Sequence, residues 1–440
     1  MLYLYCRRGL VAAILFLLTL CGNANAGLLW VEGFEQGDKN LACFTGMSQT
    51  QIATGSPASG DYFVLMEKES GMSGTCNVTS GLGATGTVYL FFRIRVVPFT
   101  TCTNTPVGSV ADWGDVDLKF TCPNGTTDYT LTLETNGAQS GNTYALPTDT
   151  WVPFLIEVAT GNGTGTTKWY QESGGTWSQM GSTHTGRTVT SIDGLTLSAP
   201  LTASGNHFQY MGFDDIYIGT GDMPTPNTYV NIRKGDSNGT YNNWPASTKV
   251  NNGTGSSNIW AVWESSPVSY VYSTNHDGTT SDNNYAQSNA GDDTTGQTMG
   301  LSAWDSGTPT PAIPASAAGV DFIHGCRYQA KAGRTTGTNR TYQLRYIAIP
   351  SPAPTAPAAT PTPIDTQVTL SAETYLTFNV IITSFGSGVA TRLNYLNGLE
   401  VGGYKSATAS GASMDIADVW VQCAWSNSGS GNITYFIPIM

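Results

Sequence analysis

Short apolar runs, separated by clusters of glycine, asparagine and threonine, recur along nearly the whole chain. Many of these runs alternate apolar and polar residues, which is the pattern of a strand with one buried face. No stretch of the first half sustains the 3.6-residue apolar period of an amphipathic helix. The pattern there predicts strands at Leu28–Glu32, Tyr62–Glu67, Thr87–Val96, Asp115–Phe120, Tyr129–Glu134, Trp151–Val158, Lys168–Gln171 and His207–Ile218.

Regular short strands without helical crossovers predict an all-β fold, with an antiparallel β-sandwich over residues 27–221. Two prolines within residues 222–228 cannot continue a strand ladder, so this segment is interpreted as a linker. Residues 229–440 form a second predicted β-rich domain, in which Ala390–Leu399 is the one short helix expected. Its strands are predicted at Tyr229–Arg233, Trp260–Trp263, Val320–Gln329, Tyr342–Ile349, Gln367–Leu370, Leu376–Ile382 and Asp418–Trp425.

Residues 1–26 have the order of a secretory signal peptide. Arg7 and Arg8 precede the apolar run Leu10–Leu20, and the small residues that follow end in the cleavage pattern Ala24-Asn25-Ala26. The apolar run is too short to span a bilayer as a helix, which takes about 20 residues, and no later segment is apolar enough. We therefore expect a secreted or cell-surface protein without a membrane span.

Charge and aromatic content narrow the possible function classes. The formal net charge is −12, and only 11% of the residues are charged. An acidic surface argues against nucleic-acid binding, which needs clustered positive charge, and against attraction to anionic lipid. Aromatic residues make up 11% of the chain, which argues against disorder and for a packed β-rich core.

Six cysteines follow the predicted signal peptide, and an even number in an exported chain predicts disulfides. The four N-terminal ones alone allow three connectivities, and the preferred pairing overall is Cys43–Cys76, Cys102–Cys122 and Cys326–Cys423. The last pair flanks the Pro/Ala-rich residues 349–363, which favours a loop within the second domain over a separate third domain. No Cys-x-x-Cys motif supports a zinc ribbon or a thioredoxin-type site.

Three stretches of the first domain occur in the order and spacing of a known family. They are the opening Trp30-Val-Glu-Gly-Phe-Glu35, the pair Asp149-Thr-Trp151 followed by Phe154–Val158, and the closing Phe213-Asp-Asp-Ile-Tyr-Ile218. Together they resemble the concanavalin-A-like jelly roll of laminin-G-like modules, legume lectins and laminarinase-type glycanases. The resemblance implies a jelly-roll sandwich and, as a function, carbohydrate binding or carbohydrate cleavage.

The whole chain is loosely similar to a group of virion structural proteins of tailed phages. A jelly roll that ends in Phe213-Asp-Asp-Ile-Tyr217 is followed by a second β-unit, and Leu393–Val401 and Val419–Gln422 match the C-terminal end of that group. This resemblance implies a structural component that packs in an assembly. An exported relative would serve on a cell surface or in a filament.

The resemblance to glycanases directs the search for catalysis to carboxylates two residues apart on a strand. Asp115 and Asp117 have this spacing, about 6.6 Å along a strand, which the two-carboxylate mechanisms of glycosidases allow. The glycanase pattern has a third carboxylate where Lys119 stands, so the preferred interpretation is a solvated, non-catalytic strand face. A glycan hydrolase or lyase that uses Asp115 and Asp117 stays as the alternative.

Calcium is the cofactor that the resemblance implies, because jelly rolls of this type often hold Ca²⁺ at the rim, between their first and last strands. Glu32, Glu35, Asp214 and Asp215 match those positions. Ca²⁺ takes six to eight oxygen ligands, so backbone carbonyls would have to contribute. The alternation of a strand puts Asp214 and Asp215 on opposite faces, so we expect only one of them to be a ligand.

Aromatic side chains near predicted turns and strand ends are candidate stacking surfaces for sugar rings. Trp113, Trp169, Tyr170 and Trp177 have such positions. The leading hypothesis is an exported, non-enzymatic structural or adhesive protein. Its jelly roll would bind a glycan or cell-surface polymer, or pack into a homo-oligomeric assembly. A glycan-active enzyme and a phage-type virion component are the alternatives.

Overall fold

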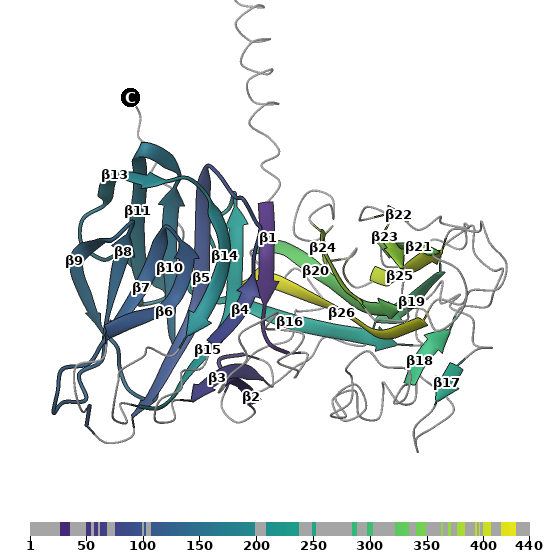
Figure 1. The fold of residues 1–440 in the computed structure, drawn as a ribbon, viewed down its shortest axis with the longest axis horizontal. Helices are drawn as coiled ribbons and strands as arrows, with labels where there is room; N and C mark the ends of the chain where they lie inside the picture. The colour runs from purple at the N-terminus through teal and green to yellow at the C-terminus, as the bar shows by residue number, and fades with distance from the viewer. Residues whose placement is uncertain are drawn as a thin grey trace, which may run out of the picture.

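The computed structural model describes residues 27–35, 50–53, 57–59, 62–67, 75–98, 101–102, 107–198, 208–236, 249–251, 284–287, 297–301, 322–333, 340–348, 362–363, 368–370, 376–382, 392–393, 396, 399–405 and 415–427. These residues form strands joined by turns, with helical geometry only at residues 392, 393 and 396 (Figure 1). The predicted all-β fold is confirmed. The predicted signal peptide, the expected strand Trp260–Trp263 and most of the expected loop 349–363 lie outside the described residues.

The first sheet holds nine antiparallel strands. Its main order is β12-β11-β10-β5-β15-β3-β2, and β1 pairs with β15 while β13 pairs with β11. The opening and closing strands of the predicted sandwich, β1 and β15, are therefore neighbours. The bounds are β1 Gly27–Glu32, β2 Thr50–Ala53, β3 Phe63–Glu67, β5 Thr87–Pro98, β10 Val152–Ala159, β11 Gly161–Ser173, β12 Thr176–Gln179, β13 His184–Val189 and β15 Phe208–Thr220.

The second sheet has six strands in the order β4-β14-β6-β7-β8-β9, and it packs on one face of the first sheet. Alternation along β7 shows the arrangement, because Val116, Leu118 and Phe120 are buried while the intervening side chains are partly exposed. The bounds are β4 Thr75–Thr79, β6 Val107–Gly114, β7 Val116–Thr121, β8 Thr130–Thr135, β9 Ala138–Ala145 and β14 Ile192–Ser198.

Aromatic rings fill the core between these two sheets. Phe92 and Phe154 stack with centroids 6.0 Å apart, and Trp169 stacks on Phe154 at 6.3 Å. Trp113 packs on Phe92 from the second sheet at 5.6 Å. Each such ring removes about 150–250 Å² of mostly apolar surface from water, so these contacts contribute much of the stability of the sandwich.

The third sheet belongs to the second half of the chain and extends away from the sandwich in Figure 1. Its main order is β17-β18-β26-β16-β19-β25-β21-β22, with β20 joining β26 to β24 and with β23 paired to β21. The bounds are β16 Thr228–Asp236, β17 Lys249–Asn251, β18 Asn284–Gln287, β19 Gln297–Leu301, β20 Phe322–Gly333, β21 Arg340–Ala348, β22 Thr362–Pro363, β23 Val368–Leu370, β24 Leu376–Ile382, β25 Leu399–Lys405 and β26 Asp415–Ser426.

The third sheet covers part of the outer face of the first sheet, and we call this contact the junction. Phe91, Leu155 and Tyr217 point outward from the sandwich, and they pack in one buried cluster with Val230 and Ala424 of the third sheet. The predicted linker, residues 222–228, leads directly into this contact. It ends in β16, which begins at Thr228 and is part of the junction.

Two predicted disulfides are confirmed. Cys102 bonds to Cys122 within the sandwich, and Cys326 bonds to Cys423 between the paired strands β20 and β26. Cys76 is also disulfide-bonded, and its expected partner Cys43 lies outside the described residues. Across the residues that the structure describes, no helix has the length and apolar character needed to cross a membrane.

The short helix expected at Ala390–Leu399 is partly confirmed. The described residues Arg392, Leu393 and Leu396 are helical, and Leu399 begins β25 instead. The three leucines of this segment are buried, as the apolar spacing predicts.

Candidate functional site

The Asp-Asp pair that closes the sandwich lies at a β-bulge. The register between β15 and β5 shifts between Asp214 and Tyr217, and Asp215 has a φ of 50°. Aspartate tolerates this left-handed conformation better than most residues, because its short side chain can bond locally. The bulge inserts one extra residue, so Ile216 and Ile218 still face the core while Tyr217 faces the junction.

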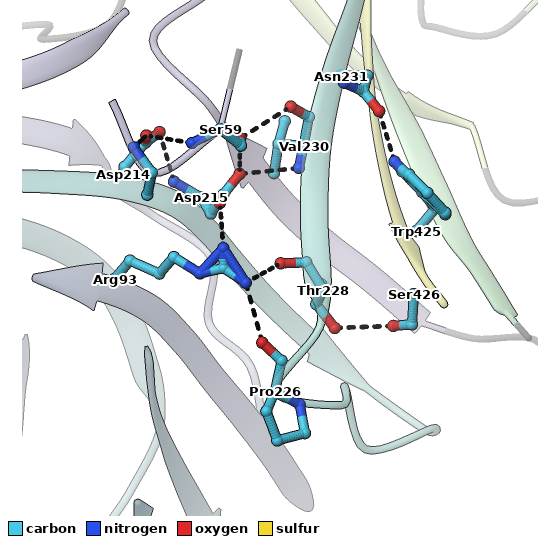
Figure 2. A network of polar contacts seen from close by, with 11 residues as sticks. Ser59, Arg93, Asp214, Asp215, Pro226, Thr228, Val230, Asn231, Trp425 and Ser426 are labelled. Carbon is cyan, nitrogen blue, oxygen red and sulfur yellow. Dashed lines mark hydrogen bonds and ion pairs between the residues drawn. The ribbon is translucent and has the colours of Figure 1, made fainter. Parts of the chain in front are cut away.

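Asp215 forms a buried ion pair with Arg93 of β5. Arg93 Nη1 lies 2.8 Å from Asp215 Oδ2, and Arg93 Nη2 donates to the carbonyls of Pro226 and Thr228 at 2.9 and 3.0 Å (Figure 2). The Val230 amide donates to Asp215 Oδ1 at 2.9 Å. This network therefore connects the sandwich to the end of the linker and to the first strand of the third sheet.

Asp214 holds a different part of the chain. Its Oδ2 accepts the amides of Ala58 and Ser59 at 2.8 and 3.1 Å, and the Ser59 hydroxyl donates to Asp215 (Figure 2). Burial raises the pKa of Asp214 well above its usual value, and the neighbouring Asp215 raises it further. Burial also raises the pKa of Asp215, whereas Arg93 lowers it, so Asp215 is the better anion of the pair.

Glu32 makes the second buried ion pair of the junction. Arg327 Nη2 of β20 donates to Glu32 Oε2 at 2.5 Å, and both side chains are fully buried. The Arg327 guanidinium also lies 4.4 Å from the centre of the Trp30 ring. Gln422 of β26 forms hydrogen bonds with both the Glu32 side chain and the Gly33 amide. Two neighbouring strands of the third sheet, β20 and β26, therefore hold the end of β1 in place.

These contacts concern the calcium site that the sequence predicts. Arg327 and Arg93 neutralise Glu32 and Asp215, while Glu35 accepts the Tyr62 amide and Asp214 accepts two amides. Within the described ranges, no group of three or more His, Cys, Asp or Glu side chains is arranged to hold a metal ion. The residues present therefore do not fit the expected site, and calcium binding stays an untested prediction.

Two of the predicted stacking residues are core residues. Trp113 and Trp169 are each only 2% exposed and pack between the two sheets of the sandwich, so neither ring offers a face to a sugar. Their strands alternate, and each tryptophan falls on the inward side of its strand. The expectation that these two rings are accessible is wrong.

The other two predicted stacking residues, Tyr170 and Trp177, lie partly exposed on the outer face of the first sheet. With Tyr89, Glu157 and Lys168 they form a group at the rim of the junction, which we call the seam patch. Glu157 accepts from Lys168 Nζ at 2.7 Å and from the Tyr170 hydroxyl at 2.9 Å.

The linker borders the seam patch. Trp177 Nε1 donates to the Pro224 carbonyl at 2.6 Å, and the Trp177 ring meets Phe91 edge to face at 6.1 Å. Met223, which precedes Pro224, is the exposed large apolar residue of the described chain. Asp222 acts electrostatically on Tyr89, and burial raises the pKa of Asp222. Aromatic, apolar and carboxylate groups thus gather at one place.

The outer face of the second sheet carries the other candidate group. Asp117 of β7 stands opposite Asp112 of β6 and opposite Glu134 of β8, and we call these three residues the carboxylate row. Lys119 Nζ lies 3.6 Å from Asp117 and 3.4 Å from Glu134, and it donates to the Ser109 hydroxyl at 2.9 Å. Burial raises the pKa of Asp112, and Asp117 raises it further, while the Gly114 amide and Lys119 lower it.

Asp115 is not part of the carboxylate row. It lies in the turn between β6 and β7, where its Oδ2 accepts the Thr190 amide at 3.0 Å and its carbonyl accepts the Asn136 amide at 2.8 Å. The strand begins only at Val116, so Asp115 and Asp117 do not stand at alternate positions of one strand, as the alternative interpretation of the sequence assumed. The partners of Asp117 come from the adjacent strands, which spacing within one strand could not show.

Comparisons with known proteins identify no family. No family model matches the chain, and no curated protein matches it. A β-glucanase catalytic domain of family GH131 from Podospora anserina is similar to 44% of this chain over 97% of its own length, with 15% identity and a TM-score of 0.34.

Two further solved structures are similar to the same share of the chain. The carbohydrate recognition domain of Emp47p matches 46% of this chain and 97% of its own, with 10% identity and a TM-score of 0.29. The CBM2 module of the evolved Dit protein of Lactobacillus casei BL23 phage J-1 matches 44% and 95%, with 11% identity and a TM-score of 0.27. These are β-sandwich domains, and likeness at this level supports no inference about activity.

Proposed function

We propose that this protein is exported and binds a neutral glycan, without cleaving it, through the seam patch. The observation that supports this proposal is the gathering of Tyr89, Tyr170 and Trp177 beside the Glu157–Lys168 ion pair. Aromatic faces offer apolar contact to the C–H surface of a sugar ring, and the adjacent charged groups offer hydrogen bonds to its hydroxyls.

Two of the three rings are held in place before any ligand arrives. The Trp177 indole is fixed by its bond to Pro224, and the Tyr170 hydroxyl is fixed by its bond to Glu157. A side chain that is already ordered loses less conformational entropy on binding, which would otherwise cost about 0.5–1.5 kcal/mol for each immobilised group. The seam patch is therefore suited to binding a ligand without rearrangement.

Charge favours a neutral ligand over an anionic one. The chain has a formal net charge of −12. Two carboxylates lie at the seam patch: Glu157, which pairs with Lys168, and Asp222, whose pKa burial raises while Arg392 lowers it. Like charges brought together at an interface repel each other, so these carboxylates would disfavour an anionic glycan while changing the affinity for a neutral glycan little. We therefore expect neutral glucans or mannans to bind better than polyuronates.

The test is isothermal titration calorimetry on neutral and acidic oligosaccharides, after a glycan-array screen of the full chain. Trp177→Ala and Tyr170→Ala should each weaken binding at least about tenfold, which corresponds to about 1.4 kcal/mol. Trp151→Ala is the matched control, because Trp151 is also partly exposed but packs on Phe63 away from the seam patch. Equal loss in the control, or no glycan ligand at all, would contradict the proposal.

Glycan cleavage at the carboxylate row is the second candidate function. Directly opposed residues on neighbouring strands have Cβ atoms about 4.5–5.5 Å apart, which is compatible with the carboxyl separation of a retaining glycosidase, about 5–5.5 Å. Asp117 and Glu134 share Lys119, whereas burial raises the pKa of Asp112. The raised pKa suits Asp112 to the proton-donating role in a catalytic pair of carboxylates.

Reducing-sugar release and the absorbance of unsaturated products distinguish hydrolase, lyase and binder. If the carboxylate row is catalytic, Asp117→Asn and Asp112→Asn abolish turnover while Asp115→Asn, which changes only the turn, retains it. No turnover by the wild-type protein on any polysaccharide that it binds would leave binding as the function. Light scattering and electron microscopy of the same samples test the alternative roles in a homo-oligomeric assembly or a virion.

A further inference from the structure

A buried histidine lies between the sandwich and the third sheet. His324 of β20 is 2% exposed, and its ring centroid lies 4.9 Å from that of Tyr217 on β15 and 4.9 Å from that of Phe322. Tyr217 belongs to the outer face of the sandwich, so the imidazole packs directly against the surface on which the third sheet is docked.

The imidazole is also bonded into the third sheet. His324 Nε2 and the Ser426 hydroxyl are 2.7 Å apart, and Ser426 in turn bonds to the Thr228 hydroxyl at 2.7 Å. One chain of contacts therefore joins β20, β26 and β16 at the point where the linker enters the sheet. The other ring nitrogen, Nδ1, is buried and has no hydrogen-bond partner among the described residues.

The charges around this ring oppose a second proton on it. Arg392 donates to the Ile323 carbonyl and lies 5.3 Å from the centre of the Phe322 ring, so a guanidinium is close to His324. On the sandwich side the ring faces Tyr217, and the nearby Asp222 carboxylate contributes to raising the pKa of that tyrosine. The other charged groups of the junction on β1 and β20, Glu32 and Arg327, form an ion pair with no net charge. Among the described residues, no carboxylate forms an ion pair with this histidine.

We propose that protonation of His324 in acid releases the third sheet from the sandwich and uncovers the outer face of the first sheet. A buried imidazolium beside Arg392 would need either water or a carboxylate, and undocking supplies water. This proposal does not rest on glycan binding. It implies, however, that Phe91, Leu155 and Tyr217 become accessible next to the seam patch in an acidic compartment.

The pH dependence of docking follows from the difference between the pKa values of His324 in the docked and released states. Burial, then Arg392, lowers the pKa of His324 to about 3. A lowered folded pKa means that the docked state is fully favoured above the ordinary value near 6.5 and loses stability as the pH falls from there towards 3. If the released ring titrates near 6.5, the released fraction rises about 25-fold between pH 7 and pH 5.

Hydroxyl-radical footprinting of the full chain tests this directly, with rates normalised to free peptides at each pH. Phe91 and Phe92 are neighbours on β5 that face the junction and the sandwich core respectively. We expect labelling of Phe91 and Tyr217 to rise about 25-fold from pH 7 to pH 5, while Phe92 does not change. Equal increases at Phe91 and Phe92 would mean global unfolding and would overturn the proposal, as would no increase at Phe91.

His324→Gln keeps a hydrogen-bonding group towards Ser426 but cannot be protonated in this range, so the acid-driven increase at Phe91 and Tyr217 should disappear. Asp214 and Asp215 also lie at the junction, but burial raises their pKa values, so their protonation favours the docked state and cannot produce that increase. His184→Gln is the matched control, because His184 opens β13 in the sandwich and lies outside the junction. An acid response that survives His324→Gln would contradict the proposal. If that variant does not fold, an NMR titration of the wild-type histidines decides, because a pKa of His324 near 6.5 would equally exclude the mechanism.

Discussion

Replacing Arg93 with methionine should destabilise the protein strongly, because it would leave the Asp215 carboxylate buried without a cation. Arg93 is nearly buried and Asp215 is fully buried, with side-chain exposures of 7% and 0%. Methionine fills most of the same volume but supplies none of the hydrogen bonds to Asp215, Pro226 and Thr228. Removing one partner of a buried ion pair costs about 3–5 kcal/mol of unfolding free energy.

The same strand provides a matched control. Arg95 lies two residues further along β5 and pairs with Asp149, whose side chain is 63% exposed. Ion pairs exposed to this degree contribute about 0–1 kcal/mol, because water screens them. Arg95→Met should therefore cost far less than Arg93→Met, although both changes remove an arginine from the same β-strand.

Urea unfolding followed by tryptophan fluorescence gives both free energies, and the double variant Arg93→Met/Asp215→Asn completes the cycle. Asparagine also tolerates the positive φ at position 215, so the double variant should lose less than the two single variants added together. In addition, the cost of Arg93→Met should shrink in acid, where the unpaired Asp215 can take a proton. Equal costs for Arg93→Met and Arg95→Met would refute this reasoning.

Three further outcomes are expected. Because arginines neutralise Glu32 and Asp215, the melting temperature of the protein should be the same with added calcium and with added chelator. A lower melting temperature with chelator would instead support the calcium site that the sequence predicts. Non-reducing mass spectrometry of the denatured protein should find Cys102–Cys122 and Cys326–Cys423 as linked peptides, with no free thiol at these positions. The isolated sandwich, residues 27–227, should bind hydrophobic dyes more strongly than the full chain, because removing the third sheet uncovers the apolar junction face.

The sequence predicts strands with a continuous apolar alternation better than strands rich in small polar residues. Apolar alternation locates β5, β8 and β10 to within two or three residues. It misses β4, β9, β13 and β14, whose sequences are rich in Thr, Ser, Asn and Gly. Such strands form because a neighbouring strand supplies the hydrogen-bonded ladder, and this information is not contained in the local pattern.

Predicting the candidate sites is harder, because their residues meet across strands. Trp113 and Trp169 look like stacking residues only if their side chains are assumed to point outward, and the bulge between Ser109 and Ala111 in β6 shows how readily the direction changes. Glu134 ends one predicted strand and Asp112 precedes another, so neither stands out locally. Only the pairing of β6, β7 and β8 brings them to Asp117.

The carboxylates near the first and last strands of the sandwich show why a metal site is hard to predict from sequence. Acidic side chains on adjacent first and last strands need a cation, and either a metal ion or an arginine can supply it. Sequence shows the acids but not which of the distant arginines will reach them. Here Arg327, almost 300 residues after Glu32, comes from the third sheet, and Arg93 reaches the linker carbonyls as well as Asp215. An arginine differs from calcium in being covalently part of the chain, so neutralising the acids also fixes the position of the element that carries it. The Asp-Asp bulge and Glu32 are therefore better understood as the groups that hold the two halves of this chain together.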